Sequence, residues 1–192
     1  MTVEQATDIL LAAYMAEVES RHRTFVDDGQ TRENCRRLAS FLTNGNSRFG
    51  VMLCGICGNG KTTLLHAFRS AMGWMEEKRP FGEERMTIRV ADAKEIVRLA
   101  KDVKSFDGLR SIPMLGIEDM GREPVDVLDF GNVLNPVVDL IEYRYDNQLF
   151  TFITTNLNGR EIRRKYGDRI ADRLNEMIEV IIFGDTTYRG MK

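Results

Sequence analysis

Hydrophobic residues recur at helical spacing near the start of the chain, three or four positions apart. They form two stripes, made by Val3, Ala6, Leu10, Ala13 and Tyr14 and by Cys35, Leu38, Ala39 and Leu42. Each stripe gives one apolar face to a helix that is polar elsewhere, so the pattern predicts two helices. We expect residues 1–45 to form a helical lead that precedes a larger domain over residues 46–192.

After residue 45 the pattern changes, and short apolar runs alternate with helical stripes. The runs are typical of strands buried on both faces and cover residues 49–54, 86–90, 114–117, 149–155 and 180–183. The stripes cover residues 61–72, 92–103, 136–143 and 159–177. Strands that alternate with helices form parallel units with helices on both faces of the sheet. The pattern therefore predicts a three-layer α/β fold with a parallel five-stranded sheet.

Local signals mark the ends of three of these helices. Gly73 follows the stripe over residues 61–72, where a C-terminal glycine is expected. Asp92 and Glu95 have the spacing of a capping box, and Asn135-Pro136 is typical of a helix start. We therefore expect one helix to begin at Asp92 and another at Asn135-Pro136.

Composition places the chain among ordinary globular proteins. Of its 192 residues, 43% are hydrophobic and 29% are charged, which excludes collagen-like, disordered and disulfide-framework classes. The net charge of −2 gives no overall attraction for nucleic acid or an anionic membrane. Three cysteines are an odd number, Glu4 and Asp8 stand where a signal peptide is basic, and no window approaches 18 uninterrupted apolar residues. We expect a cytoplasmic protein without a membrane partner.

The segment after the first predicted strand has the spacing of a phosphate-binding loop. Its sequence, Gly55-Ile56-Cys57-Gly58-Asn59-Gly60-Lys61-Thr62, matches the Walker A pattern. Glycines let the backbone wrap around a phosphate, and the amide groups of the loop and of the following helix start point at the anion. Lys61 would reach the β- and γ-phosphate oxygens, and the Thr62 hydroxyl would bind Mg²⁺. The sequence therefore predicts a nucleotide phosphate site rather than a simple glycine-rich turn.

Cys54 and Cys57 form a C-x-x-C pair in the same segment, a spacing also found in zinc and redox sites. The sequence has no second pair of this kind, and His22 and His66 are isolated from each other. We therefore expect Cys54 to pack within the strand and Cys57 to lie in the phosphate loop.

An apolar run that ends in two acids, Ile112 to Asp119, has the features of a Walker B strand. Such a strand places carboxylates near Mg²⁺ and the attacking water. One strand and one helix, over residues 86–103, separate this run from the phosphate loop. That insertion is typical of ATPases whose sheet order is 5-1-4-3-2. A surface acidic pair after a core strand is the alternative interpretation of Glu118-Asp119.

Two further sets of polar residues follow. The fourth predicted strand ends in Thr154-Thr155-Asn156, at the edge of the sheet where open α/β folds bind ligands, and an asparagine there can orient water against a γ-phosphate. Arg169 and Arg173 lie four residues apart and share one helix face. They could instead be a solvated face paired with Asp168 and Asp172.

Together these segments resemble the AAA+ ATPase module of DnaC/DnaI-type helicase loaders and the related IstB-type transposition helpers. The resemblance covers about residues 45–192 and rests on the order and spacing of residues 55–62, 118–119, 154–156, 166–174 and 187–189. It implies ATP and Mg²⁺ as cofactors. It also implies a module without a C-terminal lid domain, because the chain ends three residues after Arg189.

The resemblance also implies roles for single residues. Asn156 corresponds to sensor 1, Arg173 to the arginine finger offered to a neighbouring subunit's γ-phosphate, and Arg189 to the sensor 2 arginine. The choice between Arg169 and Arg173 as the finger stays open. The residues expected to contact ATP are Gly55, Cys57, Gly58, Asn59, Gly60, Lys61, Thr62, Thr63 and Arg189, those expected to bind Mg²⁺ are Thr62 and Glu118, and those expected to act in catalysis are Glu118, Asp119, Asn156 and Arg173.

The chain departs from the family pattern in two places. Walker B usually reads Asp-Glu or Asp-Asp, whereas this chain has Glu118-Asp119. The catalytic acid would then be the shorter Asp119, and we expect slow hydrolysis. The segment before Phe49 is also too short for the helicase-binding domain and linker helix that helicase loaders carry.

The leading hypothesis is an ATPase that self-associates through Arg173 and acts on single-stranded DNA in replication, with a replicative helicase as partner. Residues 160–173 carry a local net charge of +3, which could serve DNA or a subunit interface. The alternatives are a transposition helper with a transposase as partner and an adaptor that binds ATP with little hydrolysis. A small P-loop kinase is a further alternative, although the tail after Phe183 is too short for an arginine-bearing lid.

Overall fold

A computed structural model describes residues 1–45, 47–76, 87–124, 127–129, 132–184 and 187–188. The chain divides into two compact units. The first comprises Met1–Ser47, Gly55–Ile88 and Ile181–Lys192, and the second comprises Arg48–Cys54 and Arg89–Val180. We describe each unit by itself.

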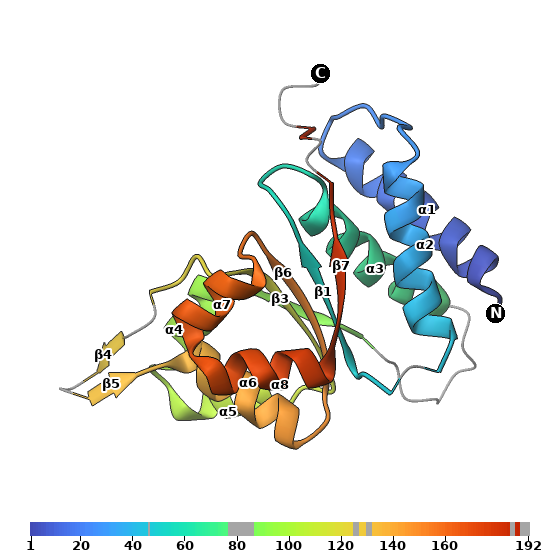
Figure 1. The fold of residues 1–192 in the computed structure, drawn as a ribbon. Helices are drawn as coiled ribbons and strands as arrows, with labels where there is room; N and C mark the ends of the chain where they lie inside the picture. Colours follow the sequence, from blue (N-terminus) through green and yellow to red (C-terminus); the bar gives the residue numbers. More distant parts are fainter. Residues whose placement is uncertain (46, 77–86, 125–126, 130–131, 185–186, 189–192) are drawn as a thin grey trace. The chain divides into compact units, whose positions relative to one another are not determined.

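A five-stranded sheet lies in the second unit, apart from Ile181 and Ile182 at the end of its last strand (Figure 1). Its strands are β1 (Gly50–Cys54), β2 (Arg89–Asp92), β3 (Met114–Met120), β6 (Phe150–Thr155) and β7 (Ile178–Ile182). They are arranged in the order β2-β3-β6-β1-β7, and the pairs β2/β3, β3/β6 and β6/β1 are parallel. This arrangement is the predicted order 5-1-4-3-2 viewed from the other edge. The predicted fold class and strand order are therefore confirmed.

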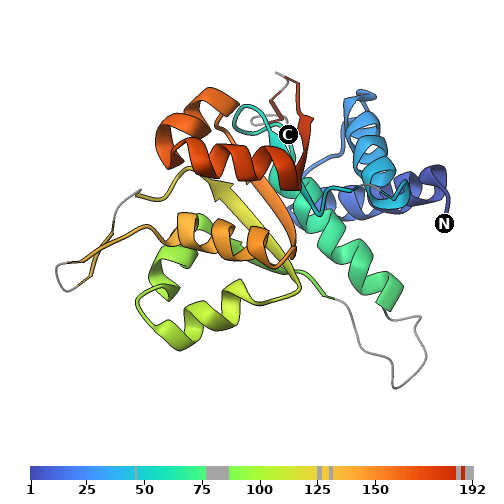
Figure 2. The same cartoon turned by 60° about the horizontal axis from the view of Figure 1, so that its bottom comes forward.

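Five helices lie within the described residues of this unit, and their apolar faces supply much of its core. They are α4 (Ala93–Leu99), α5 (Val103–Arg110), α6 (Pro136–Asp146), α7 (Gly159–Tyr166) and α8 (Asp168–Met177). Residues of these helices pack with strand residues such as Leu115, Ile117 and Ile153, which are completely buried. A two-stranded antiparallel ribbon, β4 (Val127–Asp129) with β5 (Asn132–Leu134), projects away from the helices in Figures 1 and 2.

Arg144 on α6 is completely buried in this core. Its guanidinium donates to the Thr151 hydroxyl (2.8 Å) and to main-chain oxygens of Arg110 (3.0 Å), Ile112 (2.8 Å), Pro113 (3.4 Å) and Phe150 (2.5 Å). Burial lowers the pKa of Arg144 to about 10, so the side chain stays charged at neutral pH. One buried cation therefore ties α6 to the segment before β3 and to the start of β6.

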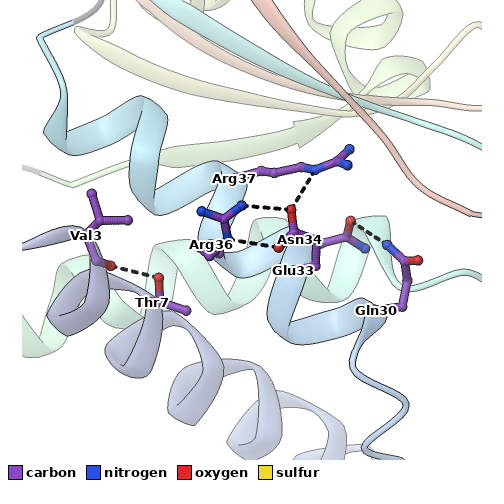
Figure 3. Close-up of polar contacts among 7 residues, drawn as sticks. All are labelled: Val3, Thr7, Gln30, Glu33, Asn34, Arg36 and Arg37. Carbon is purple, nitrogen blue, oxygen red and sulfur yellow. Dashed lines mark hydrogen bonds and ion pairs between the residues drawn. The ribbon is translucent and has the colours of Figure 1, made fainter.

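In the part of the first unit that the structure describes there are three helices, α1 (Val3–Ser20), α2 (Gln30–Thr43) and α3 (Lys61–Glu76), and α1 packs against both of the others. Thr2 and Gln5 form a capping box at the start of α1. On α2, Glu33 accepts hydrogen bonds from Arg36 and Arg37 one turn later (Figure 3). Gln30 donates to Asn34 on the same helix. The two helices predicted within residues 1–45 are confirmed.

Two helix ends and one detail of a helix cap differ from the sequence prediction, whereas the helix starts predicted at Asp92 and Asn135-Pro136 are confirmed. Gly73 lies within α3, which continues to Glu76. The stripe over residues 92–103 is split between α4 and α5, because Asp102 caps a new helix by accepting a hydrogen bond from the Ser105 amide. Asp92 does cap α4 through the Lys94 and Glu95 amides, but the Glu95 carboxylate pairs with Arg89 and not with the cap backbone.

The remaining differences concern strand ends and one break. The stripe over residues 159–177 is interrupted at Gly167, whose φ of 88° ends α7 and starts α8. The second strand occupies Arg89–Asp92 rather than residues 86–90, and Met86 lies outside the described residues. The β4–β5 ribbon was not predicted.

Candidate functional site

The phosphate loop follows β1 directly and has left-handed backbone at two of its glycines. Gly58 has a φ of 87° and Gly60 a φ of 92°, a region that side chains with a Cβ rarely adopt. A Cβ on Gly55 would lie 2.5 Å from Nδ2 of Asn59, so this glycine is also required for close approach. The loop thus has the backbone that the Walker A pattern predicts, and its curvature depends on glycine.

Lys61 begins α3 and turns its side chain back into the loop. Only 5% of the residue is exposed, and Nζ donates to the oxygens of Gly55 (2.8 Å) and Ile56 (2.7 Å) and to Oδ1 of Asn59 (3.0 Å). These three oxygens therefore hold the ammonium inside the curve of the loop. A buried cation within a glycine-lined curve fits a phosphate group, which would supply negative charge at the same place.

The other residues predicted to contact ATP occupy the same loop and helix start. Asn59 is buried, and its Nδ2 donates to the oxygen of Gly184 (3.3 Å). Thr62 and Thr63 lie half-buried in the first turn of α3, and Cys57 is exposed. Arg189, predicted as the sensor 2 arginine, lies outside the described residues.

In the second unit, Glu118 and Asp119 lie near the carboxyl end of β3, and Asn156 directly follows β6. Met120 is in register with Thr155, which is in register with Cys54 on the other side. The ends of β1, β3 and β6 therefore meet at one edge of the sheet. Both acids are half-buried there, and Asn156 is exposed. The fold brings three predicted catalytic residues to the same edge, as α/β ligand sites require.

The end of β3 is irregular at the predicted catalytic acid. Asp119 has a φ of 55°, and the pairing of β3 with β6 shifts register between Ile117 and Met120. The Asp119 amide donates to the Thr154 hydroxyl (3.0 Å), and the Thr155 hydroxyl donates to the oxygen of Met120 (2.6 Å). The two threonines of β6 therefore hold the backbone that carries Asp119, a role the sequence analysis did not assign to them.

The loop after β3 contains a second group of contacts that the sequence did not predict. Glu123 is 3% exposed and accepts hydrogen bonds from the Tyr166 hydroxyl and from the Gly121 amide (2.9 Å). Lys165 donates to the oxygens of Gly121 and Glu123, each at 2.6 Å. Burial and the Glu123 carboxylate raise the pKa of Tyr166, which keeps its hydroxyl protonated. These contacts fasten the loop after the two acids to α7.

Arg173 packs against α6. Its side chain is 15% exposed, with Nη1 3.2 Å from Oε1 of Glu142 and Nη2 3.4 Å from Oδ1 of Asp146. Its guanidinium lies 5.0 Å from the centre of the Tyr145 ring. Arg169 is 71% exposed, although its Nε also contacts Glu142 at 2.9 Å. Of the two candidate fingers, Arg169 is the more accessible and Arg173 the more firmly held.

Most of the cationic groups of residues 160–173 are paired within the unit. Arg163 bridges Asp168 (2.5 Å) and Asp172 (2.8 Å), and Arg169 and Arg173 contact acids of α6. Lys165 lies 3.6 Å from Oε1 of the buried Glu123. The acids of α6 and the loop acid Glu123 therefore offset the positive charge counted along the sequence. Arg160 and Arg164 are exposed on α7.

Comparison with solved structures gives the fold a family context. The chain is similar to a crystal structure of the DnaC helicase loader, with a TM-score of 0.63 and 23% identity over 83% of this chain and 93% of that one. It is similar to a crystal structure of DnaI, with a TM-score of 0.62 and 22% identity over 85% of this chain and 86% of that one. The chain has the fold of these two structures. The predicted resemblance is thus confirmed for the fold.

A third structure extends the comparison. The replication initiator DnaA, bound to AMPPCP and single-stranded DNA, matches with a TM-score of 0.58 and 15% identity over 84% of this chain and 49% of that one.

No protein-family model and no curated protein matches the sequence. Within the described residues, no helix is both long and apolar enough to cross a membrane.

Proposed function

We propose that the chain is an ATP-binding ATPase of the DnaC/DnaI helicase-loader type that acts in DNA replication. The observation that carries this proposal is the loop over residues 55–62, where left-handed glycines curve around the buried Lys61 ammonium. The fold shared with DnaC and DnaI supports the assignment to replication. DnaA, whose fold is also similar, is bound to the ATP analogue AMPPCP.

Each predicted residue has a role consistent with its chemistry. Lys61 would exchange its loop acceptors for β- and γ-phosphate oxygens, and the Thr62 hydroxyl and Glu118 carboxylate are oxygen donors of the kind that Mg²⁺ prefers. Mg²⁺ supplies charge neutralisation for the phosphates. Asp119 would accept a proton from the attacking water, which Asn156 would orient. We expect slow turnover because Asp119 is shorter than the usual glutamate and pairs with Arg122.

Self-association through Arg173 remains part of the proposal. In a second subunit's site, this guanidinium would have to leave Glu142 and Asp146. Such a move replaces two carboxylates by a γ-phosphate and is therefore coupled to nucleotide binding. Because most cations of residues 160–173 are already paired, single-stranded DNA binding would depend on Arg160 and Arg164, which are exposed on one helix.

An adaptor that binds ATP with little hydrolysis is the second candidate. The contact between Arg122 and Asp119 favours it, because the carboxylate would have to leave the arginine to reach a water. The same residues would bind the nucleotide in both cases. The two functions differ only in turnover.

Steady-state phosphate release tests the proposal. We would measure wild type, Lys61→Ala and Asp119→Asn at several protein concentrations, with and without single-stranded DNA. The ATPase proposal expects turnover that rises with protein concentration and is lost in both variants. Nucleotide binding without turnover in wild type would favour the adaptor, and no nucleotide binding would refute both functions.

A further inference from the structure

Two tyrosines that are far apart in the sequence contact the phosphate loop within the first unit. Tyr14 on α1 is 5% exposed, and its hydroxyl oxygen lies 2.2 Å from the place that a Cβ on Gly60 would occupy. The hydroxyl therefore packs directly against the left-handed turn that precedes Lys61. The side chains of Thr31 on α2 and Thr63 on α3 are its polar neighbours. One side chain thus connects all three helices of the unit at the loop.

Tyr188 approaches the loop from the other end of the described chain. Its amide donates to the oxygen of Gly58 (2.9 Å), and its hydroxyl donates to Oδ2 of Asp28 (2.7 Å). The hydroxyl is also 3.4 Å from Oγ1 of Thr31. Thr31 is therefore shared by the two tyrosines, and we call Tyr14, Thr31 and Tyr188 the hydroxyl cluster. The hydroxyl cluster therefore connects the contact of Tyr188 with Gly58 to the contact of Tyr14 with Gly60.

The groups around Tyr14 keep its hydroxyl neutral. Burial raises its pKa above the ordinary value, and the neighbouring Tyr188 and Cys35 act in the same direction. A neutral hydroxyl can both donate and accept, so it suits neighbours that are themselves hydroxyls. Loss of this oxygen would remove a polar neighbour from the buried Thr31 and the half-buried Thr63.

We propose that the hydroxyl cluster positions the phosphate loop for nucleotide, so that α1 and α2 are functional parts of the binding site and not only a structural lead. The proposal rests on the proposed function, since it names positioning residues for the same loop. A loop that is already held in its curved conformation loses less conformational entropy when a phosphate binds. Loosening the cluster would therefore weaken nucleotide affinity more than it weakens the fold.

The direct test is Tyr14→Phe, which keeps the ring and removes the hydroxyl. We expect the Kd for a fluorescent ATP analogue to rise about three- to tenfold, the size of one lost hydrogen bond. Tyr143→Phe is the matched control, because its ring packs against Arg110 in the second unit. The control is expected to bind like wild type. An unchanged Kd in Tyr14→Phe would overturn the proposal.

A purely structural role for Tyr14 gives a different result in thermal melts. It would lower Tm by the same amount with and without nucleotide, whereas a positioning role reduces the stabilisation that saturating nucleotide adds. Should Tyr14→Phe fail to fold, Thr31→Val replaces the shared hydroxyl with a methyl group of similar size. We expect the same loss of nucleotide-dependent stabilisation, and its full retention in a folded Thr31→Val would contradict the proposal.

A double-mutant cycle tests whether the effect of Tyr14→Phe on nucleotide affinity acts through Gly60. In Gly60→Ala the new Cβ would meet the Tyr14 hydroxyl at 2.2 Å but the ring carbon that bears it only at 3.4 Å. Backbone strain at a φ of 92° is the same in both backgrounds. We therefore expect Gly60→Ala to cost less nucleotide affinity in Tyr14→Phe than in wild type, and strict additivity would contradict the contact.

These outcomes separate this proposal from the function on which it rests. Wild type that binds no nucleotide would refute both. Wild type that binds nucleotide through Lys61, together with normal binding by folded Tyr14→Phe and Thr31→Val, would refute only the role of the hydroxyl cluster.

Discussion

Arg122 is paired with Asp119, the acid that we assign to water activation. Nη1 of Arg122 lies 2.5 Å from Oδ2 of Asp119, three residues earlier in the chain. Asp119 sits at a left-handed position after a register shift in β3, and the Thr154 hydroxyl holds its amide. The backbone thus directs this carboxylate toward the arginine of its own loop.

The pair predicts that Arg122 limits hydrolysis. Arg122→Gln removes the guanidinium that holds the Asp119 carboxylate in place. The Arg122 side chain is 61% exposed, so the gain should be modest, about two- to fivefold in kcat with KM unchanged. Phosphate-release kinetics measure it. Arg110→Gln, which breaks a partly exposed pair with Asp107 at the same spacing, should leave kcat unchanged. A fall in kcat in Arg122→Gln would show that the arginine assists the reaction instead.

Mixing two inactive variants tests whether Arg173 acts in a neighbouring subunit. Asp119→Asn keeps the arginine, and Arg173→Ala keeps the acid, so each alone should lose about a thousandfold or more in kcat. Mixed subunits should regain activity because one supplies the acid and the other the arginine. Arg169→Ala is run in parallel. If activity returns when Asp119→Asn is mixed with Arg169→Ala but not when it is mixed with Arg173→Ala, the arginine finger is the more exposed Arg169. If neither mixture regains activity, the result contradicts a finger that acts between subunits.

Arg144 should be among the most sensitive core positions. Arg144→Lys keeps the charge, but one ammonium cannot reach all five acceptors of the guanidinium. Buried oxygens before β3 and at the start of β6 would therefore lose their hydrogen-bond donor. We expect a loss of about 2–4 kcal/mol in the free energy of unfolding. Urea denaturation measures it, with the exposed Arg160→Lys as the control. A loss below about 1 kcal/mol would mean that water replaces these contacts.

The sequence was sufficient for the sheet and for the loop because both depend on local patterns. Apolar runs placed five strands, and the spacing of Gly55, Gly58, Gly60 and Lys61 predicted a curved loop with an inward lysine. Strand order came from the helix and strand inserted between the two Walker motifs. The signals for the strands and for the loop each lie within a few adjacent residues, whereas the strand order needed the order of segments from residue 55 to residue 119.

Features that depend on distant residues were not predictable in this way. The contact of Tyr14 with Gly60 and that of Tyr188 with Gly58 join positions that no periodicity relates. The net positive charge of residues 160–173 suggested a basic surface. In the fold, however, Arg169 and Arg173 contact acids on α6, and Lys165 contacts the buried Glu123. Gly73 was expected to end a helix, yet local propensity is a weak signal and α3 continues through it.

Cysteine labelling gives an independent view of the loop. Cys57 is exposed, whereas burial raises the pKa of the Cys35 thiol to about 12, so Cys35 should stay unreactive at pH 8. Nucleotide in the loop should shield Cys57. At about ten times Kd, we expect ATP to slow its alkylation about tenfold, since only free protein reacts. Mass spectrometry identifies the labelled residue, and Cys57→Ser is the control. Equal rates with and without ATP would place the nucleotide elsewhere.

The central claim is that Lys61 binds the phosphates of a nucleotide. The most direct measurement is an equilibrium titration of wild type and Lys61→Ala with a fluorescent ATP analogue in the presence of Mg²⁺, with the exposed Lys101→Ala as the charge-matched control. We predict saturable binding by wild type and the control, and a Kd about 10- to 100-fold higher in Lys61→Ala. Equal affinity in all three proteins, or no binding by wild type, would contradict the account.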